Sequence, residues 1–199
     1  FQPGSQFRYS VATDVLAHVI EKASGERLGD LLRRALFEPL HMNDTGFHIG
    51  EDAASRLMPM YGVDNIKDLS PISPPKAQTL TRIDVEAMYP SNNPQFSRGG
   101  HGLFSTTADY IKFATFLLSG QTTEGQTLLS RTMLKMLQAN RIPPQQLPLR
   151  IGLGELPGYG WGLGVRVMMD TGQAMSLTNN GEFGWAGAAS TYFWVDPSE

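Results

Sequence analysis

The spacing of apolar residues changes once along this chain of 199 residues, from a helical to an alternating pattern. In the first part, apolar side chains recur every three or four residues, as in Val15, Leu16, Val19, Ile20 and Ala23. After Pro143-Pro144 they alternate with glycine or arginine, as in Trp161, Leu163, Val165 and Val167. Helices followed by strands predict the fold class α+β, with a helical region packed against an antiparallel sheet. We expect mainly helices and loops over residues 1–150 and the sheet strands over 151–199.

Capping residues and chain breakers set the bounds of the predicted helices. Ser10 is the predicted N-cap of the first helix and Gly25 its C-terminal glycine. Thr106 or Thr107 and Ser130 are the predicted N-caps of two later helices. The predicted helices are 10–25, 28–37, a short one at 82–88, 106–120 and 130–137. The predicted strands are 161–167, a hairpin partner at 175–178, and 190–195.

Composition and charge exclude several classes of function. The net charge of −3 and a pI of about 5.8 give no basic surface of the kind that binds nucleic acid. The absence of cysteine excludes disulfides, cysteine-ligated zinc, iron–sulfur clusters and a thiol nucleophile. No apolar run approaches the roughly 20 residues that a transmembrane helix needs. These features identify no cellular compartment.

Three further patterns do not support a specific site. The four histidines are dispersed along the chain, so no metal site is predicted. Gly181, Gly184 and Gly187 have the spacing of a nucleotide-binding loop, but they precede a predicted strand rather than a helix. Ser73 and Lys76 match the Ser-x-x-Lys motif of serine hydrolases, but the two prolines between them oppose a helical turn. We interpret this match as chance.

Six sequence blocks, taken in order across nearly the whole chain, are similar to those of a known family. They are P-G-S-x-F-x-Y-S at 3–10, I-E-K-A-S-G at 20–25, F-E-P-L-H-M-N-D-T-G-F at 37–47, G-G-H-G-L-F-S-T-T-A-D-Y at 99–110, Y-G-W-G-L-G at 159–164 and G-W-A-G at 184–187. The set resembles the serine β-lactamases and penicillin-binding-protein-like hydrolases, especially class C β-lactamases and their esterase relatives. The resemblance implies a β-lactamase/transpeptidase-like fold and an acyl-enzyme mechanism with no metal or organic cofactor.

The family uses three site motifs, and the resemblance implies that this chain carries the second and the third. In the family, the first motif is a helical Ser-x-x-Lys that lies upstream of the block at 3–10. The chain begins with Phe1 rather than methionine and ends soon after a strand-like run. We therefore expect a partial domain, with a sheet incomplete at both ends and the nucleophile before Phe1. We expect this segment alone to be inactive.

Tyr9 matches the catalytic tyrosine of the family. A phenol titrates near pH 10 when unperturbed, and a neighbouring ammonium favours the phenolate. In the family, this tyrosine takes the proton of the nucleophilic serine and passes one to the leaving group. Its place just before a predicted helix N-terminus also favours an anion. From the local sequence alone, the alternative is a tyrosine that packs under the first helix.

Trp185-Ala186-Gly187 resembles the third motif, in the W-x-G form of the esterase relatives. Lysine at its first position would attract a substrate carboxylate, whereas tryptophan offers a surface and an indole N–H. Val11 stands where many family members have an asparagine that can bind the amide of a substrate. Both departures favour small esters or related acyl substrates. The resemblance implies substrate contacts at Trp185 and Gly187, and the N–H of Ala188 as one oxyanion-hole donor.

Other readings of the function stay open. Within the enzyme class, the alternative is a β-lactamase or a D-Ala-D-Ala carboxypeptidase. In a different class, it is a catalytically silent binding or regulatory relative. Trp185 could instead be a core or interface aromatic residue. The expected partner is a small-molecule ester, amide or β-lactam, and the sequence does not specify the oligomeric state.

Overall fold

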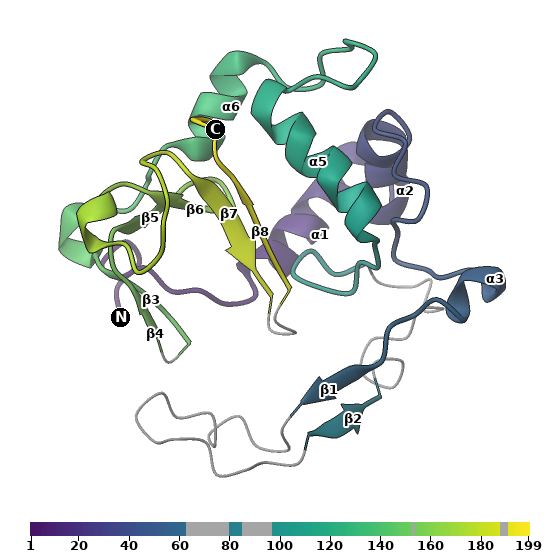
Figure 1. The fold of residues 1–199 in the computed structure, drawn as a ribbon, viewed down its shortest axis with the longest axis horizontal. Helices are drawn as coiled ribbons and strands as arrows, with labels where there is room; N and C mark the ends of the chain where they lie inside the picture. Colours follow the sequence, from purple (N-terminus) through teal and green to yellow (C-terminus); the bar gives the residue numbers. More distant parts are fainter. Residues whose placement is uncertain (63–79, 85–96, 153, 188–190) are drawn as a thin grey trace.

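A four-stranded antiparallel sheet forms the C-terminal part of the fold (Figure 1). Its strands are neighbours in chain order: β5 (Tyr159–Trp161), β6 (Arg166–Met168), β7 (Phe183–Ala186) and β8 (Tyr192–Val195). Helix α5 (Thr107–Ser119) runs beside β8. The computed structural model describes residues 1–62, 80–84, 97–152, 154–187 and 191–199.

The predicted single strand at 161–167 is wrong, because the chain turns there and forms two strands, β5 and β6, which pair with each other. Gly164 has a φ of 84°, a conformation that glycine adopts without steric cost. A side chain on Gly162 would lie 2.0 Å from the Leu137 carbonyl oxygen, because the turn lies against the end of α6 (Arg131–Gln138). The glycines that look like one face of a strand are therefore the turn itself.

The predicted hairpin partner at 175–178 is also wrong. Strand β6 pairs with β7 instead, in the register Val167 to Phe183. The Leu177 side chain is fully exposed, so the apolar residues of this segment cover no face of the sheet. The third predicted strand is confirmed as β8.

Two short hairpins accompany the main sheet. Strand β1 (Met60–Gly62) pairs with β2 (Thr81–Ile83), so the predicted short helix at 82–88 is wrong at its start, and residues 85–88 lie outside the described residues. Strand β3 (Leu149–Ile151) pairs with β4 (Gly154–Leu156). Ser73 and Lys76 also lie outside the described residues.

Helices α5 and α6 begin where their capping residues predict. The Thr106 hydroxyl accepts a hydrogen bond from the Asp109 N–H at 3.2 Å, and the Ser130 hydroxyl accepts one from the Met133 N–H at 3.2 Å. These bonds satisfy backbone donors that have no partner within the helix. Gly120 ends α5 in the left-handed conformation, with a φ of 74°.

Helix α1 (Ala12–Ser24) ends as predicted but begins differently. Gly25 is its left-handed C-terminal residue. The N-cap is Val11, which makes no side-chain capping bond, so the predicted N-cap Ser10 is wrong. The helix begins one residue later because the Val11 carbonyl already accepts a bond from the Asp14 N–H at 3.0 Å. The other helical segments are α2 (Leu28–Leu32), which continues as the π-helical turn η1 (Arg33–Phe37), α3 (Glu51–Ala54), η3 (Pro144–Gln146) and η4 (Thr171–Gln173).

The main hydrophobic core lies between helix α5 and the sheet. Phe183 of β7 is fully buried in it, and burying a side chain of this size contributes about 1.5–3 kcal/mol. A second, smaller cluster consists of Leu149, Tyr159 and Met168, on β3, β5 and β6. The buried members of the main core are Phe37, Leu40, Met42, Phe116, Leu117, Val165, Val167, Phe183 and Val195.

A buried carboxylate joins the loop after η1 to helix α5. Asp109 is 3% exposed, and its Oδ2 accepts hydrogen bonds from the Asp44 N–H at 2.8 Å and the Thr45 hydroxyl at 2.9 Å. Lys112 Nζ donates to the other oxygen at 2.9 Å. An isolated β-bridge links the same two segments. A buried carboxylate needs hydrogen-bond partners, and Asp109 finds two of them in the loop after η1. These bonds join the sequence blocks at 37–47 and 99–110 into one structural unit.

Candidate active site

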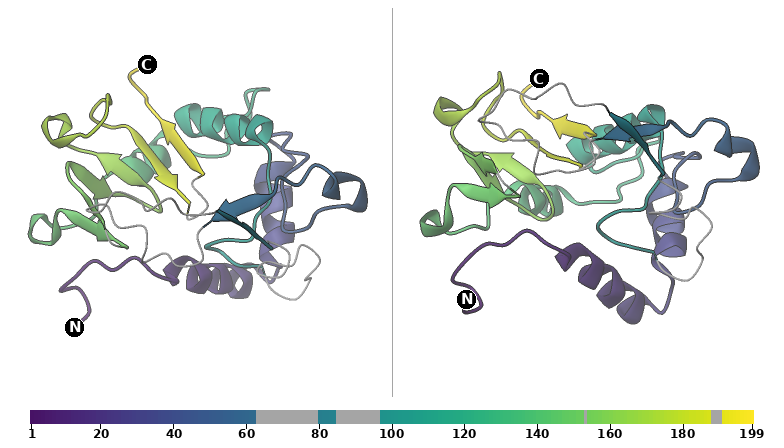
Figure 2. Two further views of the ribbon diagram at one scale, coloured as in Figure 1. Left: turned by 60° about the horizontal axis from the view of Figure 1, so that its bottom comes forward. Right: turned by 90° about the horizontal axis from the view of Figure 1, so that it is seen from below.

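Tyr9 lies on an irregular segment that runs beside the sheet before α1 begins (Figure 2). Phe7 packs against the second core cluster, and its ring centroid is 5.7 Å from that of Trp161. The Gly4 carbonyl accepts a hydrogen bond from Gln146 Nε2 at 2.8 Å. These contacts attach the segment to the sheet, while the Tyr9 side chain is 47% exposed.

Two glycines fix the first turn of α1, which follows Tyr9 closely in the chain. A Cβ on Gly99 would lie 2.1 Å from the Thr13 carbonyl oxygen, so the two segments can approach this closely only without a side chain. The Gly100 N–H donates to Asp14 Oδ1 at 3.1 Å. The glycine-rich block thus fixes the helix that leads back to Tyr9.

Trp185 lies near the end of β7, where β7 and β8 approach closely. It pairs with Phe193 of β8. A Cβ on Gly184 would lie 2.1 Å from the Phe193 carbonyl oxygen, so glycine is required before the tryptophan. The closely paired strands β7 and β8 therefore fix the position of the Trp185 backbone, from which its side chain extends.

Gly187 follows β7 and closes the hairpin. Its N–H donates to the Thr191 carbonyl at 2.8 Å, and a Cβ on Gly187 would lie 2.4 Å from Thr191 Oγ1. The small residue is thus needed within the hairpin itself, and its N–H already has a partner. Ala188 lies outside the described residues, so its role as an oxyanion-hole donor stays a prediction.

The structure brings Tyr9 and Trp185 together, although 176 positions separate them in the sequence. The indole Nε1 donates a hydrogen bond to the Tyr9 hydroxyl oxygen at 3.0 Å, and the ring centroids are 5.2 Å apart. Trp161 adds a third ring, 5.7 Å from Tyr9 and 4.5 Å from Trp185, and it is perpendicular to the latter. Trp161 is not among the predicted site residues, because its place follows from contacts between distant segments that residue type and spacing do not encode.

In this hydrogen bond the Tyr9 hydroxyl can only be the acceptor. An indole nitrogen can only donate, so the Tyr9 oxygen is the acceptor and its own proton is free for another acceptor. The same N–H would stabilise a phenolate, because hydrogen bonds to charged groups are stronger than those between neutral groups. The pair can therefore assist proton transfer to and from Tyr9.

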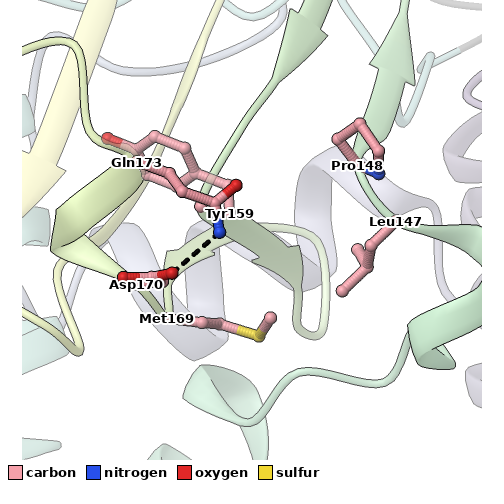
Figure 3. Close-up of a pocket in the computed structure, with 7 residues that line it drawn as sticks. Leu147, Pro148, Tyr159, Met169, Asp170 and Gln173 are labelled. Carbon is pink, nitrogen blue, oxygen red and sulfur yellow. Dashed lines mark hydrogen bonds between the residues drawn. The ribbon is translucent and has the colours of Figure 1, made fainter.

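A small cavity lies next to the second core cluster, and neither Tyr9 nor Trp185 lines it (Figure 3). The Asp170 carboxylate on its wall accepts hydrogen bonds from Gln173 Nε2 at 2.7 Å and from the Gly172 N–H at 2.9 Å. These two bonds lower the pKa of Asp170 below its usual value. The carboxylate caps η4, so we assign it a structural role. The cavity is lined by Leu147, Pro148, Gly158, Tyr159, Met169, Asp170 and Gln173.

Among the described residues, no three histidine, aspartate or glutamate side chains gather closely enough to hold a metal ion. None of the helices described above has both the length and the apolar character needed to cross a membrane.

Comparison with known proteins identifies the family. The family model described as Beta-lactamase matches residues 1–199. The chain belongs to the β-lactamase family. Within it, Protein Rv1367c of Mycobacterium tuberculosis is 30% identical over 201 residues, which cover 99% of this chain and 47% of that protein. The lovastatin esterase of Penicillium rubens is 27% identical over 191 residues, which cover 94% of this chain and 44% of the esterase.

The fold of this chain is also similar to that of solved structures. EstCE1, described as a hydrolase with promiscuous acyltransferase activity, superposes with a TM-score of 0.73 at 24% identity. The superposition covers 100% of this chain and 50% of EstCE1. The predicted β-lactamase/transpeptidase-like α+β fold is therefore confirmed. The chain spans about half the length of the curated relatives that it matches.

Proposed function

We propose that this chain supplies the tyrosine and the tryptophan motif of the active site of a serine acyl hydrolase, which acts on small esters or related acyl compounds. The observation that carries the proposal is the hydrogen bond from Trp185 Nε1 to the Tyr9 hydroxyl at 3.0 Å. Two residues that match separate family motifs share one hydrogen bond. The presence of an esterase among the relatives supports the proposed class of reaction.

In the proposed mechanism, Tyr9 transfers the protons of both half-reactions. A serine oxygen of the full-length protein attacks the ester carbonyl carbon, and the Tyr9 phenolate takes the serine proton. The bond between the acyl carbon and the leaving alcohol then breaks, and Tyr9 returns that proton to the alcohol oxygen. Water repeats the sequence on the acyl-enzyme and releases the acid. Trp185 stabilises Tyr9 whenever it is a phenolate, because the indole N–H donates to the Tyr9 oxygen and such a bond is stronger to a charged acceptor.

The preference for neutral substrates follows from the first residue of the third motif, which is the uncharged Trp185 and not a lysine. Trp185 presents an indole where lysine would bind the carboxylate of a β-lactam or a peptide. Val11, which is 63% exposed near the start of α1, offers no hydrogen bond to a substrate amide. Neutral acyl groups therefore fit this pair better than carboxylated substrates. We propose that the Ala188 N–H and the N–H of the serine stabilise the oxyanion. Gly187 has no side chain, so the substrate can lie close to the strand at this position.

The test compares hydrolysis of p-nitrophenyl butyrate and nitrocefin by the full-length protein and by its Tyr9→Phe variant. We expect ester hydrolysis to exceed nitrocefin hydrolysis, and Tyr9→Phe to lower ester turnover about 10²- to 10⁴-fold. Tyr192→Phe is the matched control, since Tyr192 is also 47% exposed. A large excess of nitrocefin turnover would instead support a β-lactamase or a D-Ala-D-Ala carboxypeptidase. A protein that turns over neither substrate would support a binding or regulatory role.

A further inference from the structure

Trp161 contacts both residues of the proposed site. Its ring is perpendicular to that of Trp185, with centroids 4.5 Å apart, and meets Tyr9 edge-on at 5.7 Å. Perpendicular aromatic pairs place the positive edge of one ring against the negative face of the other, which makes the relative orientation specific. Phe7 packs against Trp161 at 5.7 Å and supports it from the N-terminal segment.

The backbone of Trp161 is fixed from two sides. Its N–H donates to Asn140 Oδ1 at 3.0 Å, and its carbonyl accepts from the Arg141 N–H at 2.8 Å. A Cβ on Gly160 would lie 2.4 Å from Asn140 Oδ1, so the strand lies directly against this amide. Asn140 also bonds both backbone groups of Ile142, which orients the amide. The Trp161 backbone is therefore held in place, so its side chain starts from a fixed position next to Trp185 and Tyr9.

The Trp185 indole has one donor and no acceptor, so its hydrogen bond to Tyr9 is the one side-chain bond that can orient it. Rotation of its side chain would exchange that acceptor for water at little enthalpic cost. The hydrogen bond therefore depends on packing that restricts the indole, and Trp161 is the ring closest to it among the aromatic contacts described.

We propose that Trp161 is a positioning residue, which holds the Trp185 indole in the orientation that directs its N–H at the Tyr9 oxygen. The role in turnover rests on the proposed function, whereas the orientation of the indole does not. In Trp161→Leu, Trp185 keeps its place on β7 but loses the ring that restricts it, so the N–H is shared with solvent. In Trp161→Phe, an aromatic face is kept, and the effect is smaller.

The orientation is tested by NMR on the full-length protein labelled with ¹⁵N-tryptophan. Trp185→Phe identifies the indole resonance of Trp185 by its disappearance, and Tyr9→Phe shows how this resonance moves when the acceptor is lost. We expect Trp161→Leu to move the resonance in the same direction as Tyr9→Phe, Trp161→Phe to move it less, and Trp194→Leu to leave it in place. Trp194 is 58% exposed on β8 and stacks only on Tyr192 among the aromatic contacts described.

The role in turnover is tested with p-nitrophenyl butyrate. Trp161→Leu should lower kcat about tenfold with little change in KM, because it weakens one hydrogen bond to an ionising group rather than substrate binding. Trp161→Phe should restore most of kcat. An unchanged Trp185 resonance in a folded Trp161→Leu protein would overturn the proposal, and so would a rise in KM alone. If Trp161→Leu does not fold, Trp161→Met takes its place, with the same expected shift and the same refuting result. A wild-type protein without turnover would refute the proposed function, and the resonance would still decide the positioning.

Discussion

The hydrogen bond between Trp185 and Tyr9 predicts a specific loss of activity when the indole N–H is removed. Trp185→Phe keeps an aromatic ring next to Trp161, 4.5 Å away in the wild type, but removes the donor 3.0 Å from the Tyr9 oxygen. A hydrogen bond to a charged group contributes about 1.5–3 kcal/mol, and about 1.4 kcal/mol corresponds to a tenfold change in rate. We therefore expect kcat/KM for p-nitrophenyl butyrate to fall about 10- to 100-fold in the full-length protein.

A double-mutant cycle separates this bond from general damage to the site. If Trp185 acts through Tyr9, Trp185→Phe should cost almost nothing once Tyr9→Phe is present. The coupling energy between the two substitutions should then equal the whole cost of Trp185→Phe, about 1.5–3 kcal/mol. Trp194→Phe, in a tryptophan of the neighbouring strand, is the control for the loss of an indole.

Additive costs of the two substitutions would contradict this prediction. Independent sites add to within about 0.3–0.5 kcal/mol, so a coupling energy in that range would mean that the indole N–H does not serve Tyr9. Urea unfolding of each variant must accompany the kinetics, so that a lost fold is not read as a lost proton relay.

Three further predictions concern the scaffold of the full-length protein. Asp109→Ala should lower the free energy of unfolding by about 2–4 kcal/mol in urea titrations, because it removes a buried, hydrogen-bonded carboxylate; a change below about 0.5 kcal/mol would contradict this. Gly99→Ala should lower kcat more than Gly46→Ala, because only a Cβ at 99 collides with the Thr13 carbonyl; equal rates in the two variants would argue against it. Burial raises the pKa of Tyr110, so stability should decline as pH rises above about 10, where the unfolded phenol ionises first. Tyr110→Phe should remove that decline, and a persistent decline would assign it to another group.

The sequence predicts those features of the fold that depend on local chemistry. The bounds of α5 follow from Thr106 at one end and Gly120 at the other, because capping involves neighbouring backbone groups. The turn between β5 and β6 does not follow from local chemistry. Gly164 is required there by its φ of 84°, but Gly162 is required by the approach of the Leu137 carbonyl, a contact that no spacing pattern reveals. Alternation with glycine therefore predicts one long strand where the chain makes a hairpin.

The candidate site shows the same division. Tyr9 and Trp185 are identified by resemblance, and each has a structural explanation when its local sequence is considered alone. Their contact depends on the attachment of the N-terminal segment through Phe7 and on the hairpin that carries Trp185. Trp161 is missed because its importance lies in the geometry of its two ring contacts, and residue type and spacing do not encode that geometry.

Two of the sequence blocks that mark the family lie on a path of contacts that leads to the helix after Tyr9. Asp109 holds the loop after η1 against α5, and the glycine-rich segment that leads into α5 begins at Gly99, which abuts the first turn of α1. A continuous path of contacts thus runs from a buried carboxylate to the helix that follows Tyr9. Because each step is a close backbone approach or a buried hydrogen bond, a disturbance at Asp109 can reach Tyr9 only by moving backbone segments. Substitutions along this path should therefore lower kcat together with the free energy of unfolding, whereas loss of the Trp185 N–H should lower kcat alone.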